Sequence, residues 1–474
     1  MSTQPQEIID TPEALEKFKR EFRFHRYRFG IANLFFQCEE SSLGAVKTAV
    51  LKALGANDRH FGVLGACSGF IRLFEFLAMP LLNHYRSYYR SMRSALWVGV
   101  LSASVLAGAV LLGNIPNWGI IGIWSFLIWS IVMSIATGVQ INVELAWIGD
   151  MVPRKLLGWF TSVKYIISVV GMALLSLVFS LVYDYFDKIG PDNAPSVIRC
   201  LSWLENLFPH SERNFWSLLA CSLLFLFVAA SHVAAIILTS QVPDRTPAEA
   251  KFISKKRSEC INYKALPLWT YTIFFIFWTG GRTAHYALTS IFLMRVYDMK
   301  ITGVAILAAI GTLTQAVSLF FMGKVSDRWG NRKLLMIVSG LVACSMYIWT
   351  LTAWTGWKII IASYLIEGMA GHNHSMLSNN YGIEIFPSKG RAAYFGVVHL
   401  VLGIVCVLLT CFVGEFSHAL EKLQWSMDFL GATLTHYHLV FFCCSTFTLC
   451  CVIPLLLVGN RVVKPLEQDR SSED

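Results

Sequence analysis

The sequence predicts an all-α integral membrane protein of about twelve transmembrane helices, and three observations support this fold class. The chain is 55% hydrophobic and 15% charged with a mean hydropathy of +0.54, so it has too few polar side chains to cover a soluble globule of its size. Its apolar residues gather into runs of about twenty, the length that crosses a bilayer core of roughly 30 Å. Lysine and arginine lie mainly between these runs.

Each run is expected to be a helix, because backbone groups in lipid must form their hydrogen bonds within the segment itself. Six segments in the first half fit this length, at 29–54, 61–82, 94–112, 118–148, 157–182 and 215–240. Six more follow in the second half, at 268–296, 303–322, 334–355, 359–381, 392–413 and 438–457. The first and fourth segments are the least apolar, but the alternation of charge between segments requires both.

The distribution of basic residues predicts the orientation in the membrane. Lysine and arginine collect before the first segment and in the even-numbered connections, as at 86–93 and 324–333, whereas the connection 184–213 carries five acids. Cationic loops stay on the cytoplasmic side, so both termini are expected there, in a plasma or inner membrane. Contact of these loops with anionic lipid headgroups accounts for the net charge of +9 without nucleic acid.

The chain is expected to consist of two related halves. An acid stands three residues before a proline after the fourth segment, at Asp150 and Pro153, and again after the tenth, at Glu384 and Pro387. Such an echo at equivalent places is typical of transporters built from internal repeats. The expected units are a cytoplasmic amphipathic segment (1–28), a six-helix bundle (29–240), a cytoplasmic linker (241–266), a second six-helix bundle (267–459) and a cytoplasmic tail (460–474).

The most specific motif is Gly-Lys-Val-Ser-Asp-Arg-Trp-Gly-Asn-Arg-Lys at 323–333, between the eighth and ninth segments. It resembles the loop signature of the major facilitator superfamily, and the segments around Asp150 and Glu384 resemble that family's cytoplasmic signatures. Read without the family, 323–333 is a basic topology loop that happens to contain glycines. The resemblance covers nearly the whole chain and implies a cytoplasmic gate formed by Gly323, Asp327, Arg328, Gly330, Arg332, Asp150, Glu384 and Arg391.

The first half departs from the family pattern at the matching loop. Residues 80–86 contain neither the signature's acid nor its glycines. We therefore expect a lopsided gate in which Asp327 alone latches onto the amino end of the fifth helix, near Leu157 and Gly158, when the cavity is open outward.

The resemblance also implies that the first, fourth, seventh and tenth helices surround a central cavity. Polar residues do fall in these four segments, and a charge near the middle of a membrane is about 2.5–3.5 kcal/mol unfavourable to insert, so we expect them to be functional. We expect Arg282, beside Gly280-Gly281, to contact an anion, with Glu144 as its acidic counterpart. The candidate cavity residues are Gln37, Glu40, Gln140, Glu144, Arg282, His285, Glu367 and His374.

Several polar residues also have structural interpretations. His372 and His374 can equally be hydrogen-bonding residues between packed helices. Arg72 and Glu75 are spaced as an intrahelical ion pair, and Lys164 is expected to extend its amino group to the membrane surface. The cysteines lie mostly inside apolar segments, where they pack as small apolar side chains, and no His/Cys cluster has the spacing of a metal site.

These features predict a monomeric secondary active transporter that moves a small polar organic solute by alternating access, as a symporter coupled to H⁺ or Na⁺. No cofactor is expected, because the sequence lacks the phosphate loop of an ATP-driven pump. Two other classes remain open. A transporter-like receptor or scaffold would keep the same fold. An intramembrane enzyme using Glu144, Glu367, His372 and His374 fits less well, since no nucleophile stands beside a positioned base.

Overall fold

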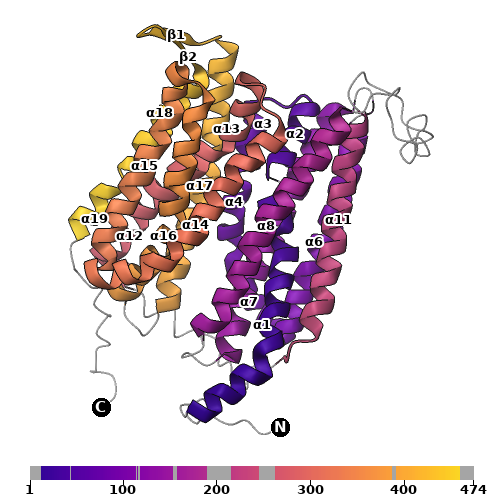
Figure 1. Cartoon of the computed structure of the whole chain (residues 1–474), viewed down its shortest axis with the longest axis vertical. Coiled ribbons are helices and arrows are strands. Elements are labelled where there is room, and N and C mark those ends of the chain that lie inside the picture. Colours follow the sequence, from indigo (N-terminus) through magenta and orange to yellow (C-terminus); the bar gives the residue numbers. More distant parts are fainter. Residues whose placement is uncertain are drawn as a thin grey trace.

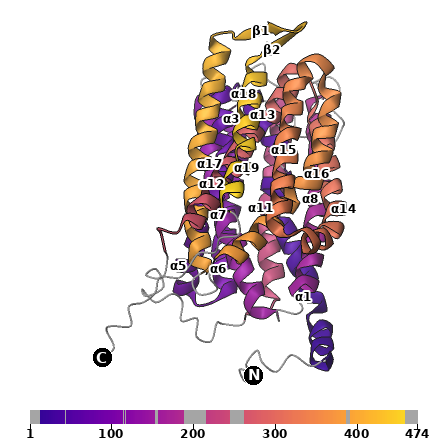
Figure 2. The ribbon, with the colours of Figure 1, turned by 90° about the vertical axis from the view of Figure 1, so that its left-hand side faces the viewer.

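The computed structural model describes residues 12–42, 44–113, 115, 118–152, 157–188, 215–244, 262–386 and 391–458. Most of them are helical, and the helices run along the long axis of the molecule (Figures 1 and 2). We call the end where α1 begins the basal end and the opposite end, which carries β1 and β2, the hairpin end. Most of the predicted linker (245–261), most of the connection 184–213 and the tail 460–474 lie outside the described residues.

The first group of helices alternates between the two ends. The first pass is broken into two helices and the second into four short elements, whereas the next four are single helices. Their bounds are α1 (Pro12–Ser42), α2 (Gly44–Ala53), α3 (Asp58–Gly65), α4 (Cys67–Phe74), η2 (Glu75–Leu77), α5 (Ala78–Tyr85), α6 (Tyr88–Leu112), α7 (Gly119–Met151), α8 (Leu157–Asp187) and α11 (Phe215–Ser240).

The second group repeats this alternation. Its first pass contains a π-helical turn, η6, and its sixth is preceded by a small antiparallel hairpin with Ser426 opposite Thr435. The bounds are α12 (Leu266–Phe275), η6 (Ile276–Gly280), α13 (Gly281–Val296), α14 (Ile301–Trp329), α15 (Asn331–Thr355), η7 (Trp357–Ile359), α16 (Ile360–Ile385), α17 (Arg391–Lys422), β1 (Ser426–Phe429), β2 (Ala432–Thr435), α18 (His436–Leu449) and α19 (Val452–Val458).

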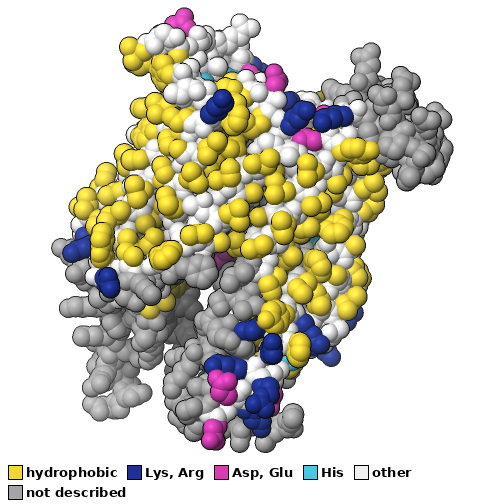
Figure 3. Space-filling view, viewed as in Figure 1, with side chains coloured by type: hydrophobic (Ala, Val, Ile, Leu, Met, Phe, Trp, Pro, Cys, Tyr) yellow, Lys and Arg dark blue, Asp and Glu magenta, His cyan; other side chains and the backbone are white. Residues whose placement is uncertain are grey.

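The predicted all-α membrane fold is confirmed. Each of the twelve predicted segments coincides with helix, and nine helices in the described ranges are long and apolar enough to cross a membrane. The predicted segments outside those nine are 29–54, 268–296 and 359–381, which are interrupted or rich in polar residues. On the face shown in Figure 3, apolar side chains cover the middle and charged ones gather toward the two ends. These three are the first, seventh and tenth segments, which the resemblance places around a cavity. The fourth segment, expected to be among the least apolar, is instead one of the nine apolar helices.

A glycine seam, defined by Gly62, Gly69, Gly403 and Gly414, joins the two groups of helices. It brings α3 and α4 of the first group against α17 of the second. A Cβ atom on Gly62 would lie 2.7 Å from the Cα of Gly414, and one on Gly403 would lie 2.6 Å from the backbone nitrogen of Leu73. Small residues permit this close approach of membrane helices, which is favoured by van der Waals packing.

A polar cluster at the hairpin end, which we call the hub, also joins the groups. Its centre is Asp58, which is fully buried at the start of α3. Arg295 Nη1 donates to Asp58 Oδ1 at 2.7 Å, and Tyr437 Oη donates to the same oxygen at 3.0 Å. Ser417 Oγ donates to Asp58 Oδ2 at 2.6 Å. The hub therefore ties the start of α3 to the ends of α13 and α17 and the start of α18.

A second contact at the hairpin end connects α8 to α14. The backbone amide of Thr302, in the first turn of α14, donates to Asp184 Oδ2 at 2.9 Å. A carboxylate is stabilised at this position by the helix dipole and by amides that have no partner within the helix. Away from this end the ribbons of the two groups diverge toward the basal end (Figure 1). The structure is thus held together at its hairpin end.

Candidate functional site

A central cavity of about 290 Å³ lies between the two groups of helices. It is bounded by α4 and α17 on the seam side and by α12, η6, α13 and α16 of the second group. Its polar lining consists of Ser68, Arg72, Thr279, Arg282, Thr283 and His374, and its remaining lining of Phe275, Trp278, Tyr286 and Cys406.

Arg282 of α13 is held against α16 by an ion pair. Its Nε donates to Glu367 Oε1 at 2.7 Å, and both side chains are largely buried. The guanidinium carbon also lies 5.7 Å from the ring centre of Trp278 and 5.3 Å from that of Tyr286, within the range of cation–π attraction. A Cβ on Gly371 would lie 2.9 Å from Arg282 Nη2, so the guanidinium packs directly against this glycine. The arginine is therefore fixed in place with part of its guanidinium facing the cavity.

His374 forms another wall of the cavity. Its ring stacks on Trp278 with centres 3.7 Å apart and planes inclined by 10°. The side chain is buried, and its Nε2 atom has no hydrogen-bond partner among the described residues. An imidazole nitrogen left without a partner beside a cavity can bind a solute.

The π-helical turn sets the direction of these side chains. It spans Ile276–Gly280 and ends immediately before Arg282's helix begins at Gly281. Adjacent glycines can bend or break a helix, and the departure from α geometry lies directly at the Gly280-Gly281 pair. The second glycine also permits close packing, since a Cβ on Gly281 would collide with the hydroxyl of Thr448 in α18. Single π turns occur frequently at functional sites.

The structure places His285 outside the cavity, contrary to the prediction. Its ring is fully buried within the second group of helices, with its centre 4.7 Å from that of Phe441 and 5.5 Å from that of Trp349. Although it is three residues from Arg282, it faces α15 and α18 rather than α16. Packing among aromatic rings accounts for this position.

Glu144 pairs with a residue other than the one predicted. Lys164 Nζ donates to Glu144 Oε2 at 2.7 Å, and both side chains are buried between α7 and α8. Glu144 is therefore not the counterpart of Arg282, and Lys164 does not extend to the membrane surface. Gln140, one turn before Glu144, is fully buried, and its amide has no partner among the described residues. Neither Gln140 nor Glu144 lines the central cavity.

Arg72 is a cavity residue that the sequence analysis missed. Its spacing from Glu75 suggested an intrahelical pair, but α4 ends at Phe74 and Glu75 begins the 3₁₀ turn η2. Glu75 Oε2 lies 3.0 Å from His399 Nδ1 of α17, whereas Arg72 lines the cavity. The change in helix geometry directs the Glu75 carboxylate to α17, so the two side chains form no ion pair, although Glu75 stays within electrostatic reach of Arg72. An arginine inside a membrane segment was the signal that could have identified it.

The gate residues are only partly described. Gly330 has φ 78° and joins α14 to α15, a conformation that favours glycine. Arg332 Nε donates to the carbonyl of Leu455 at 2.9 Å, and Asn331 Nδ2 donates to Glu384 Oε1 at 2.6 Å. Arg328 is exposed. The contacts of Gly323 and the side chains of the gate residues Asp150, Asp327 and Arg391 lie outside the described part of the structure, as do the side chains of the cavity candidates Gln37 and Glu40.

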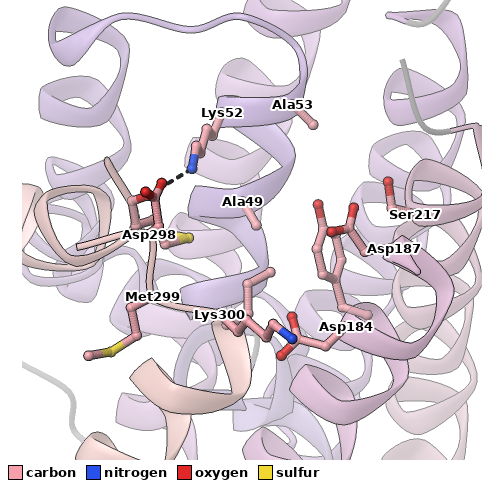
Figure 4. Close-up of a pocket in the computed structure, with 12 residues that line it drawn as sticks. Ala49, Lys52, Ala53, Asp184, Asp187, Ser217, Asp298, Met299 and Lys300 are labelled. Atoms are coloured by element: carbon pink, nitrogen blue, oxygen red, sulfur yellow. Dashed lines mark hydrogen bonds between the residues drawn. The ribbon is translucent and has the colours of Figure 1, made fainter. Parts of the chain in front are cut away.

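A second cavity, of about 480 Å³, opens at the hairpin end. Figure 4 shows charged side chains of both signs projecting into it, including Lys52, Asp184 and Lys300. Lys52 Nζ donates to the carbonyl of Met294 at 2.9 Å, and Asp184 caps α14. Because these groups already serve contacts between the two groups of helices, we assign this cavity to the closure of the hairpin end. The smaller central cavity is the candidate solute site.

Comparison with known proteins agrees with this architecture. The family model described as Major Facilitator Superfamily matches residues 29–410 and, separately, residues 270–473. No curated protein matches this sequence. The fold is similar to that of several solved structures. The chain is 12% identical to a substituted form of the nucleoside transporter NupG, with a TM-score of 0.67, covering 91% of this chain and 99% of that one.

Two further structures show the same similarity. The inward open xylose transporter XylE from E. coli is 13% identical, with a TM-score of 0.65 over 94% of this chain and 98% of that one. A structure described as a D-xylose-proton symporter is 14% identical, with a TM-score of 0.66 over 92% and 99% of the two chains. Sequence identities this low support a shared fold and carry no information on the solute.

Proposed function

Because the chain belongs to the major facilitator superfamily, we propose that it is a secondary active transporter that moves a small polar organic solute by alternating access. The observation that carries this proposal is the central cavity, which lies between two groups of helices and exposes part of the Arg282–Glu367 ion pair. Rocking of the bundles 29–240 and 267–459 about this site would expose it to one side and then to the other.

The structure corresponds to one of the two states of this alternating-access cycle, the state that is closed at the hairpin end. The hub and the Asp184 contact close the hairpin end, so a solute would enter or leave through the basal end. Cations such as Arg86, Arg90 and Arg93 lie beside the basal turn between α5 and α6. By the positive-inside rule we infer that this end is cytoplasmic and that the state is inward-facing, with both termini inside. We further propose that the transporter acts as a monomer.

Coupling to protons or another cation would involve the carboxylate of Glu367. This side chain balances the charge of Arg282 next to the cavity. If a solute draws Arg282 away, the buried carboxylate loses its counter-charge, and binding of a proton or Na⁺ would restore neutrality. A structural relative described as a D-xylose-proton symporter supports the choice of a proton.

Reconstitution into proteoliposomes tests this proposal. A metabolite panel is first screened for solutes that raise the unfolding temperature of the purified full-length protein. Each such solute is then assayed for exchange across the membrane and for accumulation driven by a pH gradient. In Glu367→Gln we expect exchange to continue and gradient-driven accumulation to fall at least about tenfold, because the coupling carboxylate is gone.

The matched control is Asp428→Asn, which removes an exposed carboxylate from the hairpin at β1. It should accumulate solute like the wild type. A solute that stabilises the wild-type protein but is neither exchanged nor accumulated would contradict transport and favour a receptor or scaffold. Full accumulation by Glu367→Gln would exclude Glu367 from coupling.

A further inference from the structure

We propose that the solute is a small organic anion whose carboxylate or phosphate group binds between Arg72 and Arg282. This inference rests on the proposed function, because it takes the central cavity to be the solute site. The proposal would place one cation of the site in α4 of the first bundle and the other in α13 of the second. Four observations on the described residues support it.

The first observation is the charge of the cavity wall. Both fully ionised side chains that line it are arginines, and no carboxylate belongs to the lining. Glu367 is not part of the lining, and it accepts a hydrogen bond from Arg282 Nε alone. A guanidinium has five N–H donors, so those on Nη1 and Nη2 remain available, and the structure gives them no hydrogen-bond partner among the described residues. The lining therefore presents two guanidinium groups and no carboxylate, and Glu367, outside the lining, forms an ion pair with Arg282 alone.

The second observation concerns Arg72. Glu75, three residues later in η2, is within electrostatic reach of Arg72, but its carboxylate contacts His399 of α17 instead. Among the described residues Arg72 has neither a hydrogen bond nor an ion pair, although it lies inside a membrane-spanning segment. A cation in that position is unfavourable unless it is paired. An anion in the cavity would supply the missing partner.

The third observation is that His374 connects the two arginines. Its buried ring lies within electrostatic reach of both Arg72 and Arg282. Its Nε2 atom has no partner among the described residues and can take part in a hydrogen bond with an oxygen of the same anionic group. Three nitrogen-bearing side chains thus converge on one space, a geometry that suits the two or three oxygens of a carboxylate or phosphate.

The fourth observation concerns the rest of the solute. Trp278 and Tyr286 present aromatic rings beside Arg282, and Phe275 adds a third. Flat apolar walls of this kind favour a ring or a short apolar body next to the charged group. An uncharged polyol could bind the hydroxyls of Ser68, Thr279 and Thr283, but it would leave Arg72 without an ion-pair partner among the described residues. A cationic solute would be repelled by both arginines.

Such a site also connects binding to movement. An anion held by α4 and α13 bridges the two bundles, so it would be bound by both cations only while they are close together. Separation of the bundles would remove one of the two contacts and weaken binding. The anion would also compete with Glu367 for Arg282, which is the event that coupling requires.

The test compares probes of one shape and different charge. Purified full-length protein is titrated with benzoate, phenyl phosphate, benzyl alcohol and benzylamine at constant ionic strength, and the unfolding temperature is recorded. We expect benzoate or phenyl phosphate to stabilise the protein, and the comparison of these two distinguishes a carboxylate from a phosphate. Benzyl alcohol should act at concentrations about tenfold higher or more, and benzylamine should have no effect.

Variants connect the effect to the two arginines. Arg72→Gln and Arg282→Gln should each weaken binding of the stabilising anion by about tenfold or more, because each removes a charge-assisted contact. Arg90→Gln, which removes an exposed arginine at the basal end of α6, should bind it like the wild type. If Arg282→Gln does not fold because Glu367 is left alone, the double variant Arg282→Gln/Glu367→Gln replaces it. Arg72→Gln breaks no ion pair among the described residues, so it measures the contribution of an arginine to anion binding independently of Glu367.

The possible outcomes separate this inference from the proposed function. Stronger stabilisation by benzyl alcohol or benzylamine than by either anion, no effect of any anion, or full binding by Arg72→Gln and the Arg282 variants would overturn the anion site. Exchange of the preferred probe in proteoliposomes tests transport separately. Binding of an anion without exchange would contradict transport and leave the anion site in place.

Discussion

At the residue scale, the positions of the buried charges could be predicted but their partners could not. Glu144, Arg282 and Glu367 were identified from their places in apolar segments. Their pairing depends on how each helix is rotated, and the hydropathy pattern does not fix that rotation when every face is apolar or polar residues are few. The actual pairs are Glu144 with Lys164 and Arg282 with Glu367.

The buried Glu144–Lys164 pair leads to a double-variant prediction. Glu144→Gln or Lys164→Met alone leaves one charge buried without its partner, which should reduce stability by about 3–5 kcal/mol. The combined variant should recover most of that loss. The unfolding temperature of purified protein provides the measurement. The exposed pair Glu16 and Lys19, whose charged atoms are 2.6 Å apart, serves as the control and should change stability by less than about 1 kcal/mol. Equal losses in the single and double variants would contradict this account.

At the element scale, the existence of the helices followed from apolar runs, whereas the glycine seam could not be predicted. Gly280-Gly281 is recognisable in the sequence because two adjacent glycines are unusual within a helix. Gly62 and Gly414 stand alone in sequence, and only the packing of α3 on α17 shows why each must lack a side chain. Close approach of two backbones is a property of the pair of helices rather than of either sequence.

The seam gives a matched pair of substitutions within α17. In Gly414→Ala the added methyl group would meet the backbone of α3, so we expect a loss of about 1–3 kcal/mol from overpacking. In Gly396→Ala the methyl group enters open space, and the better helix propensity of alanine should raise stability by about 0.5–1 kcal/mol. Thermal unfolding compares them directly. A stabilised Gly414→Ala would mean that the two helices are not in contact there.

At the scale of the whole molecule, two six-helix halves were predicted from charge alternation and from the echo between Asp150 and Glu384. Which end is closed could not be predicted, because the hub uses residues scattered from Asp58 to Tyr437. The latch proposed for Asp327 concerns the opposite, outward-open state, and that side chain lies outside the described residues. It therefore stays a prediction.

The hub predicts how the hairpin end opens. Asp58→Asn removes the negative charge that balances Arg295 and weakens charge-assisted hydrogen bonds worth about 1.5–3 kcal/mol each. Amides near the start of α3 and the end of α13 should then exchange with deuterium about tenfold faster or more, since the outward-open state becomes more populated. Asp428→Asn, on the exposed hairpin, should leave this exchange unchanged. Unaltered exchange in Asp58→Asn would show that the hub does not hold the bundles together.

The π-helical turn at Ile276–Gly280 has a consequence for evolution and for comparing sequences. A π turn amounts to one extra residue in an otherwise regular helix, so loss of a single codon there would rotate everything after it by about 100°. Arg282 would then leave Glu367 and face other neighbours, although only one residue had been lost. A relative without the extra residue must be aligned with a gap in the middle of this helix. Placing that gap in a loop would match Arg282 to a side chain on the wrong face.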